Sequence, residues 1–125
     1  NMGGLDRITT KEVYKVPERV VAAMAWQIAT GLNYLHETKR SVHRDIKPAN
    51  ILWATSGRVK ISDFGLASLE DEKSSNALLG TRLYISPERY EGTCTFTSDI
   101  YALGLILVEL LTGHHALVRK IYKTP

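Results

Sequence analysis

The sequence is poor in cysteine, in long apolar runs and in clustered positive charge. Its 125 residues contain a single cysteine, Cys94, which excludes an internal disulfide and favours a reducing, intracellular setting. The longest apolar run, residues 102–108, is far too short to cross a bilayer. A net charge of +3 without a basic stripe gives little support to nucleic-acid binding. No cationic and apolar leader opens the chain, so we expect a cytoplasmic protein that binds neither membrane nor nucleic acid.

Apolar residues recur at helical spacing in two segments. The first predicted helix spans residues 17–36, with Pro17 well placed at its first position. The second runs from Ser98-Asp99 to Leu111 and ends at Gly113, because glycine is favoured where a helix stops. Asp99 is a candidate N-cap of this helix. Since the second helix is apolar nearly all round, we expect it to be buried on every side.

Between the two helices, residues 43–65 read HRDIKPANILWATSGRVKISDFG. The pair Ser56-Gly57 separates two β-compatible runs, residues 51–54 and 59–61, which predicts a tight hairpin. With the turn centred on Ser56-Gly57, the two residue numbers of every cross-strand pair have the same sum. This register places position 54 opposite 59 and position 52 opposite 61.

The same register would place Asn50 opposite Asp63, with both side chains on one face of the hairpin. Cβ atoms of such a pair stand roughly 5 Å apart, and magnesium takes oxygen ligands at about 2 Å. The pair therefore predicts a cation site, with Leu52 and Ile61 forming an apolar surface beside it. An isolated Asn/Asp pair more often caps a hairpin.

The residues around this pair favour the metal site, because they resemble the catalytic machinery of protein kinases. His43-Arg44-Asp45 followed by Asn50 is similar to the kinase catalytic loop, and Asp63-Phe64-Gly65 to the magnesium-binding motif. Residues 80–88, GTRLYISPE, resemble the segment that ends in the APE motif, with serine in place of alanine. Residues 99–104, DIYALG, resemble the start of the central buried helix.

The resemblance runs from Met2 to about Gly113 and concerns the C-terminal lobe of a eukaryotic protein kinase. It implies an α+β protein-kinase-like fold, namely a mainly helical C-lobe fragment with a small catalytic-loop β-hairpin. Residues 1–125 would form a partial kinase domain with the N-lobe absent. The stretches MGGLD, YISPER and SDIYALG most resemble mitogen-activated protein kinase kinases.

Roles in catalysis follow from the resemblance. Asp45 would accept or orient the proton of the substrate hydroxyl, and Lys47 would neutralise charge on the transferring phosphate. The place of Lys47, two residues after Asp45, resembles serine/threonine rather than tyrosine kinases. His43 would be structural.

The resemblance also implies a site for ATP and Mg²⁺. Asn50 and Asp63 would hold the metal, and Leu52 would form the floor beneath adenine. Met2 and Lys47 would complete the nucleotide site.

Further residues would belong to the activation and substrate loop. Arg44 would pair with an activation-loop phosphate, or is a surface charge. Thr81 would help to shape the pocket for the residue after the phosphoacceptor. Glu88 would pair with an arginine from a later helix. Asp99, besides being an N-cap candidate, would bond buried backbone around the catalytic loop.

The activation loop departs from the kinase kinases at its phosphorylation sites. The two acceptors would fall at Lys73 and Ala77, neither of which can be phosphorylated. We expect Ser74 or Ser75 to serve instead, or the acidic residues 70–72 to supply part of the negative charge.

Two readings of the function remain. The first is an ATP- and magnesium-dependent protein serine/threonine kinase of the mitogen-activated protein kinase kinase type. It would be activated by an upstream kinase and act on a protein substrate, for which a downstream kinase is a candidate. The glycine-rich loop and the ATP-anchoring lysine would precede Met2, so the 125 residues alone should be inactive, with the central helix partly uncovered. The second is a non-catalytic pseudokinase or scaffold, which would follow if the gene lacks the N-lobe.

Overall fold

The computed structural model describes residues 2–9, 15–62 and 82–117. These ranges form helices and one antiparallel sheet of three strands in the order β1-β2-β3. The elements, in chain order, are β1 (Met2–Gly4), α1 (Asp6–Thr9), α2 (Glu18–Asn33), the π-helical turn η1 (Tyr34–Thr38), the 3₁₀ turn η2 (Pro48–Asn50), β2 (Ile51–Ala54), β3 (Val59–Ile61), α5 (Pro87–Tyr90) and α6 (Phe96–Thr112). Among the described residues, no helix combines the length and the apolar character that crossing a bilayer requires.

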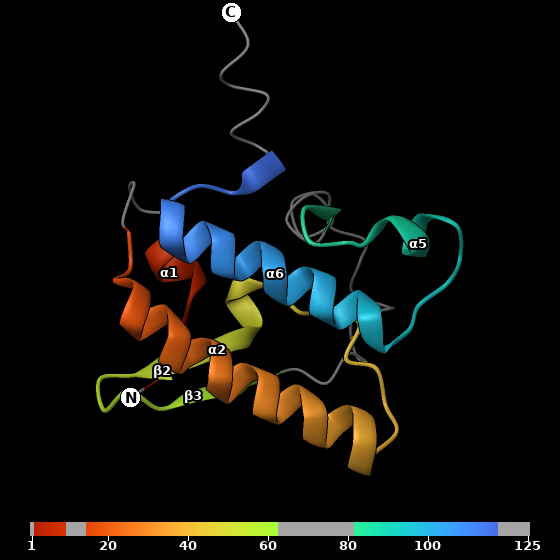
Figure 1. Cartoon of the computed structure of the whole chain (residues 1–125), viewed down its shortest axis with the longest axis horizontal. Helices are drawn as coiled ribbons and strands as arrows, with labels where there is room; N and C mark the ends of the chain where they lie inside the picture. Colours follow the sequence, from red (N-terminus) through yellow and green to blue (C-terminus); the bar gives the residue numbers. More distant parts are fainter. Residues whose placement is uncertain (1, 10–14, 63–81, 118–125) are drawn as a thin grey trace, which may run out of the picture.

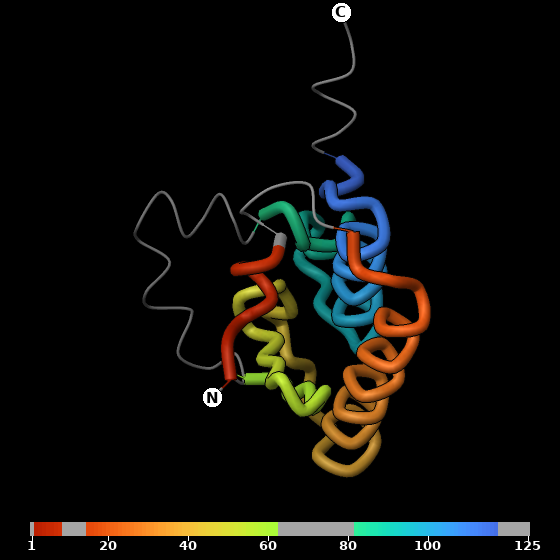
Figure 2. The backbone as a smooth tube through the Cα atoms, turned by 90° about the vertical axis from the view of Figure 1, so that its left-hand side faces the viewer, coloured from red at the N-terminus to blue at the C-terminus, as the bar shows by residue number. Residues whose placement is uncertain are grey.

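The helices α2 and α6 pack along each other, and the hairpin of β2 and β3 lies against α2 (Figures 1 and 2). The segment that leads into α2 is tied to the end of α6 by a hydrogen bond of 2.8 Å from the Val16 N–H to the Leu110 carbonyl. One apolar core joins the helices and the sheet. It contains Leu5, Val16, Val21, Met24, Ile28, Leu32, Ile46, Ile51, Val59, Ala102, Leu103, Ile106 and Leu110.

The first predicted helix is confirmed, with small shifts at its ends. Pro17 is the residue before the helix rather than its first member, because its ψ of 141° is extended. Its carbonyl accepts the first hydrogen bonds, from the N–H groups of Val20 and Val21. After Asn33 the helix widens into the π turn η1, which buries His36.

The second predicted helix is confirmed in its C-terminal end but not in its cap. Gly113 follows α6 with a φ of +79°, a left-handed backbone that glycine adopts without strain. The helix begins at Phe96, and the N-cap is Thr95, whose N–H donates to Ser98 Oγ at 3.1 Å. The prediction of Asp99 as N-cap is therefore wrong, because the helix starts one turn earlier.

Burial of α6 on every side is also not observed. Ile100, Val108 and Leu111 are 50%, 39% and 41% exposed, whereas Ile106 and Leu110 are buried. The described residues cover the face of α6 that meets α2 and leave the opposite stripe exposed.

The hairpin forms, but its register differs by one residue from the prediction. Leu52 pairs with Lys60, and Trp53 with Val59. The loop has three residues instead of two: the Ala54 N–H donates to the Arg58 carbonyl and the Gly57 N–H to the Ala54 carbonyl, both at 2.9 Å. Gly57 takes a φ of +89°, the left-handed position that such three-residue loops require.

This register corrects the predicted pair of Asn50 and Asp63. Asn50 lies opposite Ser62, whose N–H donates to the Asn50 carbonyl at 2.8 Å. Asp63 itself lies outside the described residues. Ile61 pairs with Ile51, which is fully buried, so it faces the core rather than sharing a surface with Leu52.

Candidate active site

The segment between η1 and η2 is held by one buried carboxylate at the start of α6. Asp99 is 2% exposed, and its Oδ2 accepts hydrogen bonds from His36 Nε2 at 2.7 Å and from the His43 N–H at 2.8 Å. Its Oδ1 accepts from the Arg44 N–H at 3.0 Å. Asp99 was predicted either to cap α6 or to hydrogen-bond buried backbone, and the second prediction is confirmed by the bonds from the N–H groups of His43 and Arg44. Helix α6 thereby fixes the backbone that leads into Asp45.

The ring of His43 bridges this segment to the end of the hairpin. His43 is 1% exposed, and its Nε2 donates to the Ser62 carbonyl at 2.8 Å. Its Nδ1 accepts from the Asp45 N–H at 3.1 Å, which fixes the neutral tautomer with the proton on Nε2. The predicted structural role of His43 is confirmed by this burial and these bonds.

Three of the predicted site residues come together around one carboxylate. Asn50 Nδ2 donates to Asp45 Oδ2 at 3.0 Å and to the Asp45 carbonyl at 2.8 Å. Lys47 Nζ lies 3.5 Å from Asp45 Oδ2. The side chains of Asp45 and Lys47 are 11% and 23% exposed, so the pair is largely shielded from water. A largely shielded carboxylate is therefore oriented by an amide and faces an ammonium group.

The chemistry of Asn50 fits a share in a cation site. Its two hydrogen bonds to Asp45 use the amide nitrogen, which leaves the amide oxygen as the acceptor for a hard cation. Within residues 2–9, 15–62 and 82–117, no cluster of three or more His, Cys, Asp or Glu side chains is arranged to hold a metal. The second predicted ligand, Asp63, is outside these ranges.

The sheet brings together two residues predicted for the nucleotide site. Met2 pairs with Ala54, and Gly4 pairs with Leu52. Paired residues and residues two apart share a sheet face, so Met2 and Leu52 are diagonal neighbours on the face opposite the core. Met2 is 37% exposed and Leu52 is half-buried.

A comparison with protein families matches residues 1–124 to the protein kinase domain. The chain belongs to the protein kinase domain family. Together with the helices and the small sheet, this match gives the kinase-like α+β fold that the sequence predicts. Its members transfer phosphoryl groups to proteins, and the family generally uses ATP and Mg²⁺.

Of the residues predicted for the activation and substrate loop, the structure describes two, Arg44 and Glu88. Arg44 is exposed and adopts a left-handed φ of +76°. Glu88 Oε1 accepts a hydrogen bond of 3.0 Å from Ser98 Oγ. The bond from its own backbone N–H is the main cause that holds the pKa of Glu88 below its usual range. The predicted residues Ser74, Ser75 and Thr81 lie outside the described residues.

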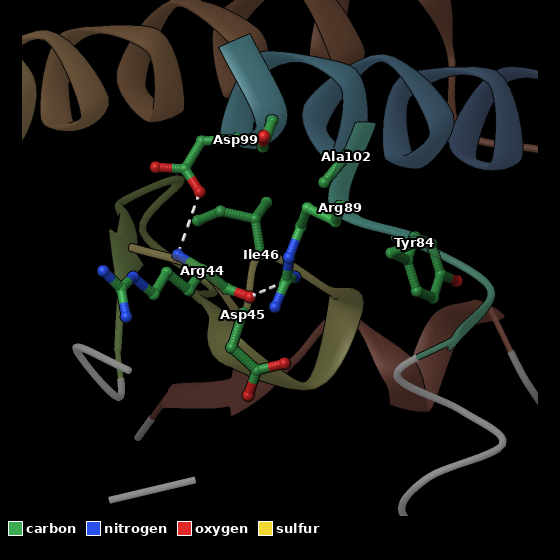
Figure 3. Close-up of a pocket in the computed structure, with 8 residues that line it drawn as sticks. Arg44, Asp45, Ile46, Tyr84, Arg89, Asp99 and Ala102 are labelled. Atoms are coloured by element: carbon green, nitrogen blue, oxygen red, sulfur yellow. Dashed lines mark hydrogen bonds between the residues drawn. The ribbon is translucent and has the colours of Figure 1, made fainter. Parts of the chain in front are cut away.

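Sequence reasoning missed Arg89, which contacts the backbone next to Asp45 directly. Its Nη1 donates to the Arg44 carbonyl at 2.7 Å. Figure 3 shows this bond and the bond from Arg44 N–H to Asp99 as dashed lines. The residues of both bonds line one pocket, whose lining is Arg44, Asp45, Ile46, Tyr84, Arg89, Ser98, Asp99 and Ala102.

A second missed cluster joins α6 to the segment before α5. The Tyr84 hydroxyl donates to Glu109 Oε2 at 2.6 Å, and His115 Nε2 donates to the Leu83 carbonyl at 2.8 Å. Burial, and then the bond to Glu109, raise the pKa of Tyr84, while burial raises the pKa of Glu109. The sequence does carry a signal for this cluster: Glu109 is a carboxylate inside an apolar helix, and a buried charge needs a partner.

Proposed function

We propose that the protein is an ATP- and magnesium-dependent serine/threonine kinase, most similar to mitogen-activated protein kinase kinases. The chain would supply the C-terminal lobe of its catalytic domain. The observation that carries the proposal is the shielded cluster in which Asn50 and Lys47 both contact Asp45 Oδ2. This arrangement suits a carboxylate that must stay in one orientation while it handles a proton.

The geometry suggests a division of work between the two carboxylate oxygens. Among the described residues, Asn50 and Lys47 both contact Oδ2 of Asp45, so we assign Oδ1 to the substrate hydroxyl. There it accepts or orients the hydroxyl proton as the oxygen attacks phosphorus. Lys47 stands close enough to Asp45 to stabilise negative charge on the phosphate that is transferred.

ATP would supply the phosphoryl group, and Mg²⁺ would neutralise its developing charge. Asn50, through its amide oxygen, and Asp63 are the residues proposed to hold the cation. Met2 and Leu52, which share one face of the sheet, are proposed to border the adenine site. Lys47 would complete the nucleotide site.

Specificity for serine and threonine rests on the position of Lys47, two residues after Asp45. We propose that Thr81 helps to shape the substrate pocket and that Arg44 pairs with a phosphate placed on Ser74 or Ser75. Partners would be an upstream activating kinase and a protein substrate, a downstream kinase being one candidate. A cytoplasmic location is proposed from the single cysteine.

The pseudokinase or scaffold reading predicts that the transfer machinery has no function. The positions of Asp45, Lys47, Asn50 and Asp63 all carry residues competent for transfer, which favours the kinase. The two readings differ in whether the full-length protein turns over ATP.

The test is phosphoryl transfer by the full-length protein from γ-labelled ATP to a protein substrate. We expect transfer that requires a divalent cation and yields phosphoserine or phosphothreonine. Transfer confined to tyrosine would refute the specificity, and absence of transfer after treatment with an activating kinase would favour the scaffold. A Ser74→Ala/Ser75→Ala variant should lose activation; unchanged activation would reject these two acceptors.

A further inference from the structure

The peptide that joins Arg44 to Asp45 is held at both of its polar groups. Its carbonyl oxygen accepts from Arg89 Nη1 at 2.7 Å, and its N–H donates to His43 Nδ1 at 3.1 Å. Because the peptide group is planar, fixing both groups fixes its orientation. The preceding peptide is anchored separately, since the Arg44 N–H donates to Asp99 Oδ1. These bonds together determine how the backbone enters Asp45.

Arg44 needs such restraint because of its backbone conformation. Its φ of +76° is in the left-handed region, which residues other than glycine adopt only at a cost in free energy. Without restraint, the loop would relax toward a negative φ and turn the following peptide. Such strained residues persist where the surrounding contacts over-determine them.

Arg89 is itself placed by α6, the helix whose Asp99 anchors the Arg44 N–H. It belongs to α5, and the neighbouring Glu88 accepts a hydrogen bond of 3.0 Å from Ser98 Oγ. Ser98 precedes Asp99 at the start of α6, so both restraints on Arg44 are attached to the same end of one helix. Figure 3 shows Arg89 and Asp99 reaching the loop from this side.

We infer that Arg89 is a positioning residue for phosphoryl transfer: it holds the Arg44 carbonyl and thereby the peptide that presents Asp45. The inference rests on the proposed kinase function. It assigns Arg89 to the backbone of the catalytic loop and not to the protein substrate.

The first test compares steady-state kinetics of Arg89→Met and Arg89→Lys in the full-length protein. Methionine keeps the apolar stem and removes the donor, so we expect kcat to fall about tenfold while KM for ATP stays within about twofold. Lysine retains a donor and should restore most of kcat. Arg19→Met, which removes an exposed arginine from α2, is the control and should leave kcat unchanged. A rise in KM for the protein substrate with unchanged kcat would overturn the inference.

The second test isolates the backbone of Arg44. Arg44→Ala and Arg44→Gly both remove the guanidinium group, but only glycine adopts a positive φ without strain. Adding Arg89→Met should lower kcat about tenfold in the alanine background and less than about twofold in the glycine background. Equal losses in both backgrounds would contradict the positioning role.

A third measurement separates this inference from the proposed function, because it needs no turnover. Amide hydrogen exchange of residues 43–47 should accelerate about tenfold in Arg89→Met and much less in Arg44→Gly/Arg89→Met. If exchange responds in this way but the wild type transfers no phosphoryl group, the kinase proposal fails while the restraint by Arg89 stands. If exchange does not respond, the restraint is refuted whatever the activity.

Discussion

Replacing Asp99 by asparagine tests how much the segment that leads into Asp45 depends on one buried carboxylate. The substitution keeps the shape of the side chain, so no cavity forms, but it leaves only one acceptor oxygen. If the amide nitrogen takes the place of Oδ1, it faces the Arg44 N–H; if it takes the place of Oδ2, it faces His36 Nε2 and the His43 N–H. Either way, at least one buried donor loses its acceptor.

The expected cost follows from these contacts. A buried donor left unpaired costs about 1–3 kcal/mol, and the remaining bonds drop to roughly half their strength when the acceptor loses its charge. We expect Asp99→Asn to lower the free energy of unfolding by about 3 kcal/mol. Since domains of this size are stable by roughly 5–15 kcal/mol, the loss is a large part of the total.

Urea unfolding followed by tryptophan fluorescence measures this loss, because Trp53 packs against the core. With a slope of about 2 kcal/mol/M, the midpoint should fall by about 1.5 M. The control is Glu37→Gln, which breaks an ion pair of 3.7 Å to Arg40 between side chains that are 66% and 67% exposed. Such a pair contributes less than about 1 kcal/mol. A midpoint for Asp99→Asn as close to wild type as that of Glu37→Gln would refute the reasoning.

Three further predictions concern two glycines and the contact between Tyr84 and Glu109. Gly57→Ala should lower the free energy of unfolding by about 1 kcal/mol, because the φ of +89° at this position is strained for alanine. Gly104→Ala should raise the free energy of unfolding by about 0.5–1 kcal/mol, because glycine inside a helix is less favourable than alanine. No atom lies within 4 Å of either new Cβ, and urea midpoints that move in the same direction for both variants would contradict this. Tyr84→Phe should cost about 1–3 kcal/mol in the same assay, because Glu109 loses the hydroxyl donor at 2.6 Å; an unchanged midpoint would show that the bond contributes nothing. Burial raises the pKa of Glu109 above its ordinary 4.5, so its contribution to stability is complete below 4.5 and is lost as pH rises through the folded-state pKa. Glu109→Gln should therefore remove part of the fall in stability between about pH 4 and pH 7, and a pH profile parallel to wild type would argue against it.

The two long helices could be predicted from the sequence because their signals are local. Apolar spacing places Met24, Ile28 and Leu32 on one face, and all three are buried. Gly113 correctly marks the end of α6. The cap of α6 was harder to predict, since Thr95 and Asp99 both qualify locally and the tertiary contacts of Asp99 decide between them.

The register of the hairpin could not be predicted from its composition alone. Ser56-Gly57 marks a turn in either case, but a two-residue and a three-residue loop differ by one position in pairing. Because side chains alternate between faces, that single step moves Ile61 from the face of Leu52 to the core. The buried Ile51 opposite Ile61 shows which pairing the core selects.

In the candidate site, what was predictable is the part that lies close together in the sequence. Asp45, Lys47 and Asn50 are within six residues, and the 3₁₀ turn η2 brings them together. Arg89 bonds a backbone carbonyl 45 residues away. Every residue has such a carbonyl, so no pattern of residue types indicates that contact.

The most direct test of the kinase proposal separates turnover from nucleotide binding in the full-length protein. In Asp45→Asn the amide oxygen can still accept from Asn50, so the loop should keep its structure and the dissociation constant for ATP should stay within about twofold. We expect kcat for phosphoryl transfer to fall by about 10²- to 10⁴-fold, the range that a positioned general base contributes. A variant that keeps kcat within about tenfold of wild type would contradict the role of Asp45, and with it the proposed mechanism.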